Sequence, residues 1–156
     1  MQIITIPNPL LRKRSQKIKL ADLKTPEMQK FIEDLAKIMK EDNGIGIAAP
    51  QVAKNIRIII VETEDGPQPF INPRVIWKSL KREIGEEGCL SIPDVYGLVR
   101  RSKSVIVIYL DRQGNKKRLK AKGLMARVLL HEIDHLNGVL FTDRMVKQTS
   151  GDKIRI

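Results

Sequence analysis

One apolar segment, residues 124–136, limits most strongly how this chain can fold, and it contains both of the chain's histidines. Its apolar side chains recur at helical spacing and leave little polar surface: Leu124, Val128, Leu129, Leu130, Ile133 and Leu136. Asn137-Gly138 follows as a stop signal, because glycine readily adopts the left-handed conformation that ends a helix. The segment therefore predicts a helix at the centre of the domain.

The two histidines, His131 and His135, lie four positions apart with Glu132 between them. On a helix this spacing separates two side chains by only about 40° in azimuth and about 6 Å along the axis, so both imidazoles project from one face. Glu132 lies about 100° around the helix, where it can handle the protons of a bound water. A lone buried histidine is more often a hydrogen-bonded core residue. Two histidines with a glutamate in this slot instead predict a divalent metal site.

The third metal ligand must come from another segment, because a catalytic tetrahedral site uses three protein ligands and one open position. No histidine remains, and a carboxylate can serve. Cys89 is the more suggestive candidate, because Gly88 and Ser91 flank it between strand-like segments. It is the only cysteine, which excludes an internal disulfide and favours a reducing compartment. Such a cysteine can be a ligand, a nucleophile or a core residue.

The length and composition predict one globular domain over residues 1–156. A hydrophobic fraction of 42% is ordinary for a folded domain, and 156 residues suffice for a single core. No apolar run approaches the roughly 18 residues of a membrane span, and the N-terminal segment does not resemble a signal peptide. We therefore expect a cytoplasmic protein that does not bind membranes.

A second helix and several short strands are expected before residue 123. Thr25 is a suitable N-cap with Pro26 as the first helical residue, and Asn43-Gly44 marks the end of this helix. Short β-branched segments bounded by Gly, Pro or Asp predict strands at 57–62, 69–71, 75–84 and 104–110, followed by a charged edge strand at 116–122. The predicted fold is α+β, with short, mostly antiparallel strands packed around the central HExxH-bearing helix and a second, N-terminal helix.

The segment GIGIAAPQV, residues 44–52, follows the N-terminal helix. It is not a dinucleotide fingerprint, because a helix precedes it where a strand should and the third glycine is missing. Its small residues allow another chain to approach the backbone closely. Gln51 offers a neutral amide donor at the end of this segment.

Three segments together resemble the signature motifs of the peptide deformylases: GIGIAAPQ, EGCLS and HEIDHLNG, in the same order and with similar separations. IPNPLLR near the start, FINP at 70–73 and LFTDR after the last helix are also similar to the family. The resemblance implies hydrolysis of the formyl group from the N-terminal formylmethionine of newly synthesised bacterial or, less typically, organellar proteins. It also implies one divalent metal ion per chain, held by Cys89, His131 and His135. In this family the metal is typically iron(II), with zinc, nickel or cobalt as substitutes.

The resemblance also assigns roles near the metal. Glu132 is expected to be the general base. The Gln51 side-chain amide and the backbone N–H of Leu90 are expected to stabilise the oxyanion that forms during hydrolysis. One departure from the family is Leu130, which stands where most members have a glutamine. A second is the segment VYGLVRR, which follows EGCLS without the early arginine of many members.

The methionine side chain of such a substrate needs an apolar pocket. Leu124 and Val128 precede His131 by seven and three positions and share its face of the helix, and Ile45 can close the other side. Arg127 is expected to line the rim with its aliphatic part and to direct its charge to water. The peptide beyond methionine is expected to add as a strand along Ile45-Gly46.

Two other functions remain open on the motifs and charge alone: a general HExxH metallopeptidase, and a basic RNA-binding module with a structural metal. The net charge of +11 predicts weak, salt-sensitive contact with the ribosome through basic clusters at Arg12–Arg14, Lys116–Lys122 and Lys147–Arg155. Aromatic residues make up only 4% of the chain, which argues against a base-stacking domain of the RRM or OB type. No DNA partner is expected.

Overall fold

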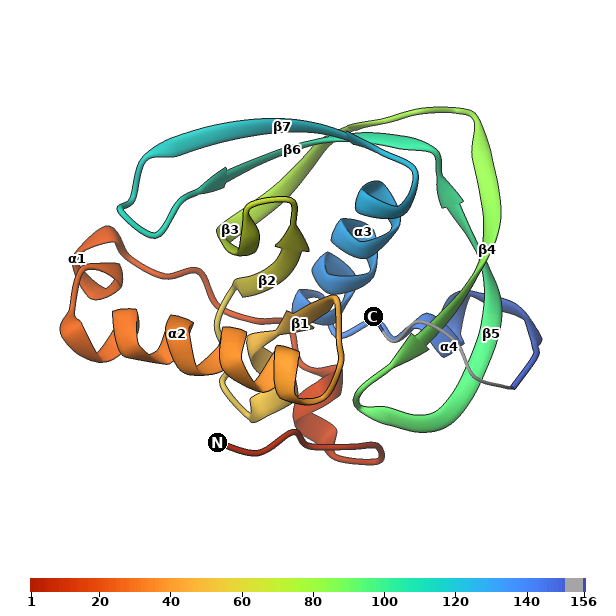
Figure 1. Cartoon of the computed structure of the whole chain (residues 1–156), viewed down its shortest axis with the longest axis horizontal. Helices are drawn as coiled ribbons and strands as arrows, with labels where there is room; N and C mark the ends of the chain where they lie inside the picture. The colour runs from red at the N-terminus through yellow and green to blue at the C-terminus, as the bar shows by residue number, and fades with distance from the viewer. Residues whose placement is uncertain (151–155) are drawn as a thin grey trace.

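The computed structural model describes residues 1–150 and Ile156, and shows two antiparallel sheets with helices between and beside them (Figure 1). The five-stranded sheet has the order β1-β2-β3-β6-β7 and the three-stranded sheet the order β4-β5-β8. The strands of the larger sheet are β1 Gly46–Ala48, β2 Ile58–Thr63, β3 Gly66–Lys78, β6 Ser104–Leu110 and β7 Lys116–Lys122. The strands of the smaller sheet are β4 Arg82–Cys89, β5 Ile92–Ser102 and β8 Met145–Gln148.

The helices are two long and two short segments within the described residues. The α-helices are α1 Leu20–Leu23, α2 Pro26–Glu41, α3 Leu124–Leu136 and α4 Phe141–Arg144. Two 3-10 turns, at Pro9–Arg12 and Ala49–Val52, complete the helical segments. The predicted α+β fold with antiparallel strands is confirmed. No helix among these residues is both long and apolar enough to cross a membrane.

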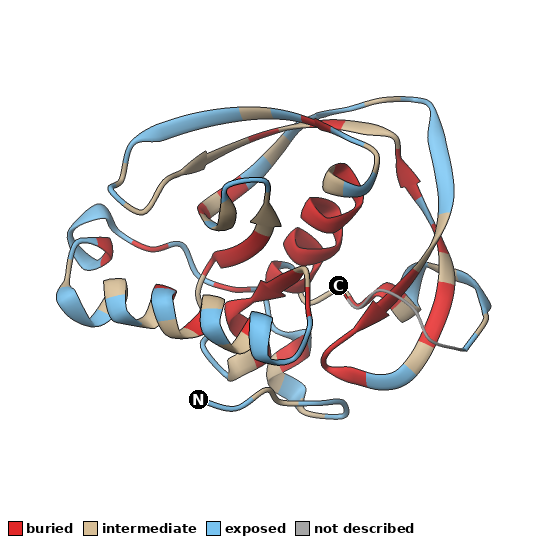
Figure 2. Ribbon diagram, viewed as in Figure 1, coloured by how far each residue is buried: buried red, intermediate tan, exposed pale blue. Residues whose placement is uncertain are grey.

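The α2 and α3 helices pack on opposite faces of the five-stranded sheet, because side chains alternate along each strand. Toward α3 the sheet contributes a set of buried residues: Ile59, Val61, Phe70, Val105 and Val107. Toward α2 it contributes Ile47, Ile58, Ile60 and Ile71. Figure 2 shows that α3 is buried along nearly its whole length, whereas α2 is exposed on its outer side.

The ends of both long helices follow their local sequence. The Thr25 hydroxyl accepts a hydrogen bond from the Met28 N–H, and Pro26 is the first residue of α2, as predicted. Asn43 then adopts a φ of 57°, which ends the helix. The α3 helix stops at Leu136, and Gly138 adopts a φ of 73°.

One strand prediction was wrong, and one long strand was missed. Residues 75–84 are not one strand, because the chain leaves β3 at Lys78 and enters the other sheet at Arg82. Between them Leu80 is fully exposed, and the Ser79 hydroxyl donates to the Lys81 carbonyl. The long strand β5 was not predicted, because proline, aspartate and glycine interrupt its sequence. Pairing with β4 and β8, rather than propensity, makes it a strand.

The edge strand β7 matches its prediction, and it pairs with β6 from Ser104↔Lys122 to Leu110↔Lys116. Of the three basic clusters predicted from sequence, those at Arg12–Arg14 and Lys116–Lys122 are described. The third, Lys147–Arg155, lies outside the described residues from position 151 onward.

Candidate metal centre

Cys89, His131 and His135 come together in the space between the smaller sheet and α3. Cys89 is the last residue of β4, and the histidines lie one helical turn apart on α3. The candidate ligand atoms all lie within 4.8 Å of one another, and all three residues are buried. The Cys89 Sγ is 3.3 Å from the Nε2 of His135. These residues therefore form a site with the sulfur and nitrogen donors that transition-metal ions prefer.

Several buried polar atoms at this site have no hydrogen-bond partner among the described residues. They include the Nε2 of His131 and both carboxylate oxygens of Glu132. The other ring nitrogen of His131, Nδ1, lies 2.8 Å from Glu87 Oε1, which leaves Nε2 as its ligand atom. Unsatisfied buried polar atoms are costly. A metal ion with an attached water would satisfy them, so the residues fit the predicted metal.

The electrostatics of the cluster also favour a cation. Burial raises the pKa of the Cys89 thiol, and the nearby Glu132 carboxylate adds to this effect. Burial lowers the pKa of His135 well below its usual value, and coulombic interactions with His131 and Arg101 act in the same direction. His135 is therefore neutral, as a metal ligand must be, whereas a Cys89 thiolate requires a neighbouring cation.

Glu132 lies beside the three candidate ligands and is fully buried. Burial raises its pKa well above the usual value, and the Glu87 carboxylate adds to the increase. A carboxyl group with a raised pKa can both accept and return a proton near neutral pH. The carboxylate packs against β1, since a Cβ added at Gly46 would lie 2.6 Å from Glu132 Oε1. Only glycine fits there.

Glu87 holds the His131 ring through its Nδ1 atom, a role that was not predicted from the sequence. Its carboxylate accepts hydrogen bonds from Arg101 at 2.9 and 3.0 Å and from Arg127 at 2.7 Å, and it contacts His131 Nδ1. Burial acts to raise the Glu87 pKa, but hydrogen bonds from His131 and Arg101 outweigh it and lower the pKa. Glu87 and Cys89 lie two residues apart on β4, so their side chains are expected on the same face of the strand. This spacing is the sequence feature from which a role for Glu87 near the metal could have been predicted.

The charge network continues from Arg101 to the α3 residue Asp134. Arg101 donates to Asp134 at 2.6 Å, and Arg144 donates to the same carboxylate at 2.6 and 3.0 Å. These contacts tie β5 and α4 to the helix that carries the histidines. The cations next to the metal centre are thus paired with carboxylates.

Arg127 requires a correction. Its charge does not reach water, as the sequence had suggested, because its side chain is only 10% exposed. Besides Glu87, the guanidinium donates to the carbonyls of Val99 at 2.8 Å and Glu83 at 2.9 Å. It also lies against Gly85, where an added Cβ would be 2.8 Å from the guanidinium carbon. Arg127 therefore joins α3 to the smaller sheet.

Gln51 reaches the cluster from the turn after β1. Its side-chain oxygen accepts the Ala48 N–H at 2.8 Å, which directs the amide NH₂ toward Cys89 Sγ at 3.6 Å and Ser91 Oγ at 3.2 Å. Leu90 follows Cys89 in the two-residue turn between β4 and β5. Among the described residues its N–H has no backbone acceptor outside the strand ladders. Both donors thus lie next to the cluster, while their roles stay predictions.

The predicted pocket residues differ in burial. Val128 is buried in the cluster between α3 and the sheet, and Ile45 packs against the same cluster. Leu124 is 54% exposed at the start of α3. Leu130, which replaces the family's glutamine, is buried in this apolar core and needs no hydrogen-bond partner. Whether Leu124, Val128 and Ile45 contact a substrate stays a prediction.

Comparison with known proteins identifies the family to which this architecture belongs. A family model described as polypeptide deformylase matches residues 1–150. The chain belongs to the peptide deformylase family. The peptide deformylase of Dictyoglomus turgidum is 41% identical over 151 residues, which cover 96% of this chain and 95% of the relative. That of Mesorhizobium japonicum is 43% identical over 150 residues, covering 93% of this chain and 84% of the relative.

Solved peptide deformylase structures have the same fold. The enzyme from Thermotoga maritima superposes with a TM-score of 0.87 at 36% identity, covering 92% of this chain and 96% of that structure. The enzyme from Acinetobacter baumannii with Met-Ala-Ser bound gives a TM-score of 0.89 at 34% identity, covering 93% and 98%. The predicted family and enzyme class are confirmed. A general metallopeptidase and an RNA-binding module with a structural metal do not account for this match over the whole chain.

Proposed function

We propose that this chain removes the formyl group from the N-terminal formylmethionine of newly synthesised polypeptides. Water is consumed, the formamide C–N bond breaks, and formate and a free N-terminal amine are released. The observation that carries the proposal is the buried Cys89, His131 and His135 cluster, with Glu132 beside it and its carboxylate unpartnered among the described residues. Glu132 packs against Gly46 of the edge strand β1, and an edge strand beside the cluster supports a peptide substrate.

Cys89, His131 and His135 would hold one divalent metal ion, most simply iron(II) as in the family. Such an ion lowers the pKa of water and polarises a carbonyl oxygen when it is bound. The donor set does not select iron, because divalent-ion affinities favour zinc over iron(II) at such a site. Nickel and cobalt are further substitutes. Glu87 keeps the proton on His131 Nδ1 and thereby directs Nε2 to the ion.

Glu132 is the proposed general base. It takes a proton from the attacking water and later returns it to the nitrogen of the leaving amine. The Gln51 amide and the Leu90 N–H are proposed to donate hydrogen bonds to the oxygen that becomes negative during the attack. Ala48 holds the Gln51 amide in the orientation that this role needs. These donors cost no reorganisation, because the fold holds them in place.

The substrate backbone is proposed to pair with β1, which is an edge strand of its sheet. The Ile45 carbonyl accepts the Glu62 N–H at 2.9 Å. Hydrogen-bonded and non-hydrogen-bonded pairs alternate along an antiparallel ladder, so the N–H and C=O of the next residue, Gly46, point away from β2. The described residue Ile156 shows that an aliphatic side chain fits between Val128 and the strand that carries Gly88. Its side chain is buried in the cluster that contains Val128, and its N–H donates to the Gly88 carbonyl at 3.2 Å.

The chain is further proposed to act in the cytoplasm of a bacterium, where nascent polypeptides leave the ribosome. Its net charge of +11 supports weak electrostatic contact with ribosomal RNA. Such contact should weaken steeply as salt rises through about 0.2 M, as the release of counterions requires. Cosedimentation with ribosomes across a salt series measures it, and binding that does not respond to salt would contradict it.

Hydrolysis of formyl-Met-Ala by the metal-loaded protein tests the proposed function directly. Formate release is expected from this substrate, while Met-Ala without a formyl group and an internally blocked peptide should remain intact. Cleavage of the blocked peptide would instead indicate a general metallopeptidase. Absence of hydrolysis with iron(II), nickel, cobalt and zinc alike would reject both enzymes.

A further inference from the structure

The half of the five-stranded sheet that lies away from the metal centre has an exposed face. The α2 helix packs on β1, β2 and part of β3, while the β6–β7 hairpin extends beyond it (Figure 1). Val105 and Val107 of β6 point to the opposite, buried face. The alternate residues of β6, among them Ile106 and Ile108, therefore point away from α3.

Rows of directly opposed residues cross this face and share one side of the sheet. One row is Arg74, Ile108 and Arg118, and a second is Trp77, Ile106 and Lys120. Each row thus has a cation on β7 and an apolar residue on β6. We call this surface the basic face, defined by Arg74, Trp77, Arg118 and Lys120 together with the adjoining cavity.

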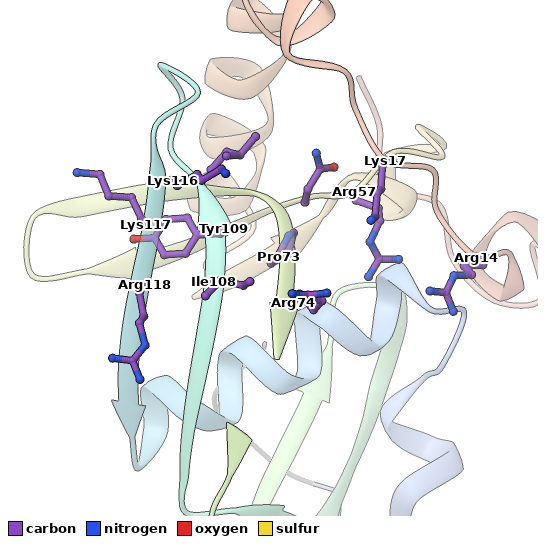
Figure 3. Close-up of a pocket in the computed structure, with 12 residues that line it drawn as sticks. Arg14, Lys17, Arg57, Pro73, Arg74, Ile108, Tyr109, Lys116, Lys117 and Arg118 are labelled. Atoms are coloured by element: carbon purple, nitrogen blue, oxygen red, sulfur yellow. The ribbon is translucent and has the colours of Figure 1, made fainter. Parts of the chain in front are cut away.

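The adjoining cavity has a volume of about 770 Å³, and the described residues that line it are all neutral or positively charged (Figure 3). Its cations come from four segments of the chain: Arg14, Lys17, Arg57, Arg74, Lys116, Lys117 and Arg118. Of the residues that the structure describes, no carboxylate lines it, and neither does any of the predicted metal ligands. Arg14 and Arg57 are close enough for repulsion. Burial lowers the pKa of Arg57, and the charge of Arg14 adds to that decrease.

Most of these cations have no ion-pair partner within the described part of the chain. Lys117 lies 4.0 Å from Asp111, and Arg57 donates to the Leu136 carbonyl and to Asn137. Among the described residues Arg14, Arg74 and Arg118 have neither an ion-pair partner nor a side-chain hydrogen bond, although acidic residues are common elsewhere on the surface. A concave group of unpaired guanidinium and ammonium groups favours a ligand with several negative charges.

An exposed aromatic residue extends the face beyond the cavity. Trp77 is 46% exposed, and the Lys120 ammonium lies 5.8 Å from the centre of its ring. An accessible indole beside unpaired cations is the combination that binds single-stranded nucleic acid, since phosphates contact the cations while a base stacks on the ring. A flat lipid surface fits a concave site less well than a flexible phosphodiester chain does.

We propose that the basic face binds the phosphate backbone of single-stranded RNA without sequence preference, with Trp77 as a stacking residue. This site is separate from the metal centre, so the chain would hold RNA and a peptide substrate at the same time. The link to nascent polypeptides rests on the proposed function, whereas RNA binding itself does not.

Fluorescence titration with an oligouridylate of about twelve nucleotides tests the proposal. Trp77 is the only tryptophan, so quenching of intrinsic fluorescence reports contact at this face. We expect saturable quenching at about 50 mM salt and loss of binding by about 200 mM. The double variant Arg74→Glu and Arg118→Glu should weaken binding by about tenfold or more and reduce the slope against the logarithm of salt by about two.

The matched control reverses two exposed charges outside this face and outside the predicted basic clusters, Lys40→Glu on α2 and Arg100→Glu on the smaller sheet, which produces the same net charge. It should change the affinity by less than about twofold at the same salt. Equal weakening by both double variants would show diffuse attraction and overturn the site. Absence of quenching in the wild type, or quenching by phosphatidylserine vesicles in preference to the oligouridylate, would also overturn it.

Hydrolysis of formyl-Met-Ala separates this proposal from the proposed function. Both double variants should keep wild-type hydrolysis, because their substitutions lie outside the candidate metal centre. Loss of RNA binding with retained hydrolysis in the Arg74 and Arg118 variant supports the basic face. Hydrolysis that is absent from every form, with quenching unchanged, would reject the enzyme and leave the RNA site in place.

Discussion

The metal centre and the basic face differ in whether their arginines are paired with carboxylates. Beside the metal centre Arg101 and Arg127 are largely removed from water and each donates to a carboxylate, and the half-exposed Arg144 donates to the buried Asp134 carboxylate. On the basic face the corresponding residues are exposed and have no acidic partner within the described chain: Arg14, Arg74 and Arg118. Buried charges are stable only when folding pairs them, whereas exposed charges are solvated and can remain for a ligand. The first region should respond to substitution through catalysis and stability, and the second mainly through binding.

The largest expected effect is at Glu132. Glu132→Gln removes the proposed base but none of the candidate ligands, so formyl-Met-Ala hydrolysis should fall about 10²- to 10⁴-fold while one metal per chain is retained. Metal analysis and steady-state kinetics on the same preparation measure both. Cys89→Ala is the contrasting variant, because it should lose metal and activity together. Loss of metal from Glu132→Gln as well would make Glu132 a ligand.

Arg101→Ala should destabilise the fold by about 3–5 kcal/mol, because it leaves Glu87 and Asp134 with too few cations in a dry interior. Urea denaturation followed by circular dichroism gives the free energy of unfolding. An exposed pair, Glu83 with Lys103 at 3.5 Å, provides the control. Glu83→Gln should cost less than about 1 kcal/mol. Similar losses from both variants would remove the distinction between buried and exposed pairs.

Gln51→Leu tests the proposed oxyanion donor. Removal of one such donor should lower kcat by about 10²-fold while KM for formyl-Met peptides changes much less. The substitution also leaves the Ala48 N–H without its acceptor, so thermal unfolding should be measured in parallel. If KM rises and kcat does not change, Gln51 positions the substrate and does not stabilise the transition state.

Glu87→Gln should weaken metal binding by about 10- to 100-fold, because an amide holds His131 Nδ1 less firmly than a carboxylate does. Competition with a chelator gives the metal affinity without any measurement of activity. The conservative variant keeps the shape of the side chain, so the protein should remain folded. Unchanged affinity would show that Glu87 serves the arginines alone.

The smallest effect is expected on the basic face. Arg118→Ala should change the free energy of unfolding by less than about 0.5 kcal/mol, since the side chain is exposed and has no ion-pair partner among the described residues. The same denaturation experiment as for Arg101→Ala measures it. A loss of several kcal/mol would mean that this cation has a structural role, and the comparison of the two regions would fail.

Local sequence patterns predicted the parts of the fold that depend on neighbours along the chain. Thr25 with Pro26 begins α2 as predicted, and the charged alternation at Lys116–Lys122 predicted the edge strand. Wrong or missing predictions occur where distant segments decide the structure. The break at Ser79–Lys81 and the strand Ile92–Ser102 depend on strand pairing in the smaller sheet. This pairing produces no hydrophobic periodicity in the local sequence from which it could be predicted.

The candidate site divides in the same way. By itself the sequence determined the family, the spacing of His131 and His135 on one helical face, and Cys89 as the third candidate ligand, because motif spacing and helical periodicity are local. Only the tertiary structure decided that Glu87 supports His131, that Arg127 is buried, and that Arg74 and Arg118 share a face and have no acidic partner among the described residues. Hydrogen bonds and burial depend on segments tens of residues apart, and the side chains around a charge determine whether it is paired or left for a ligand.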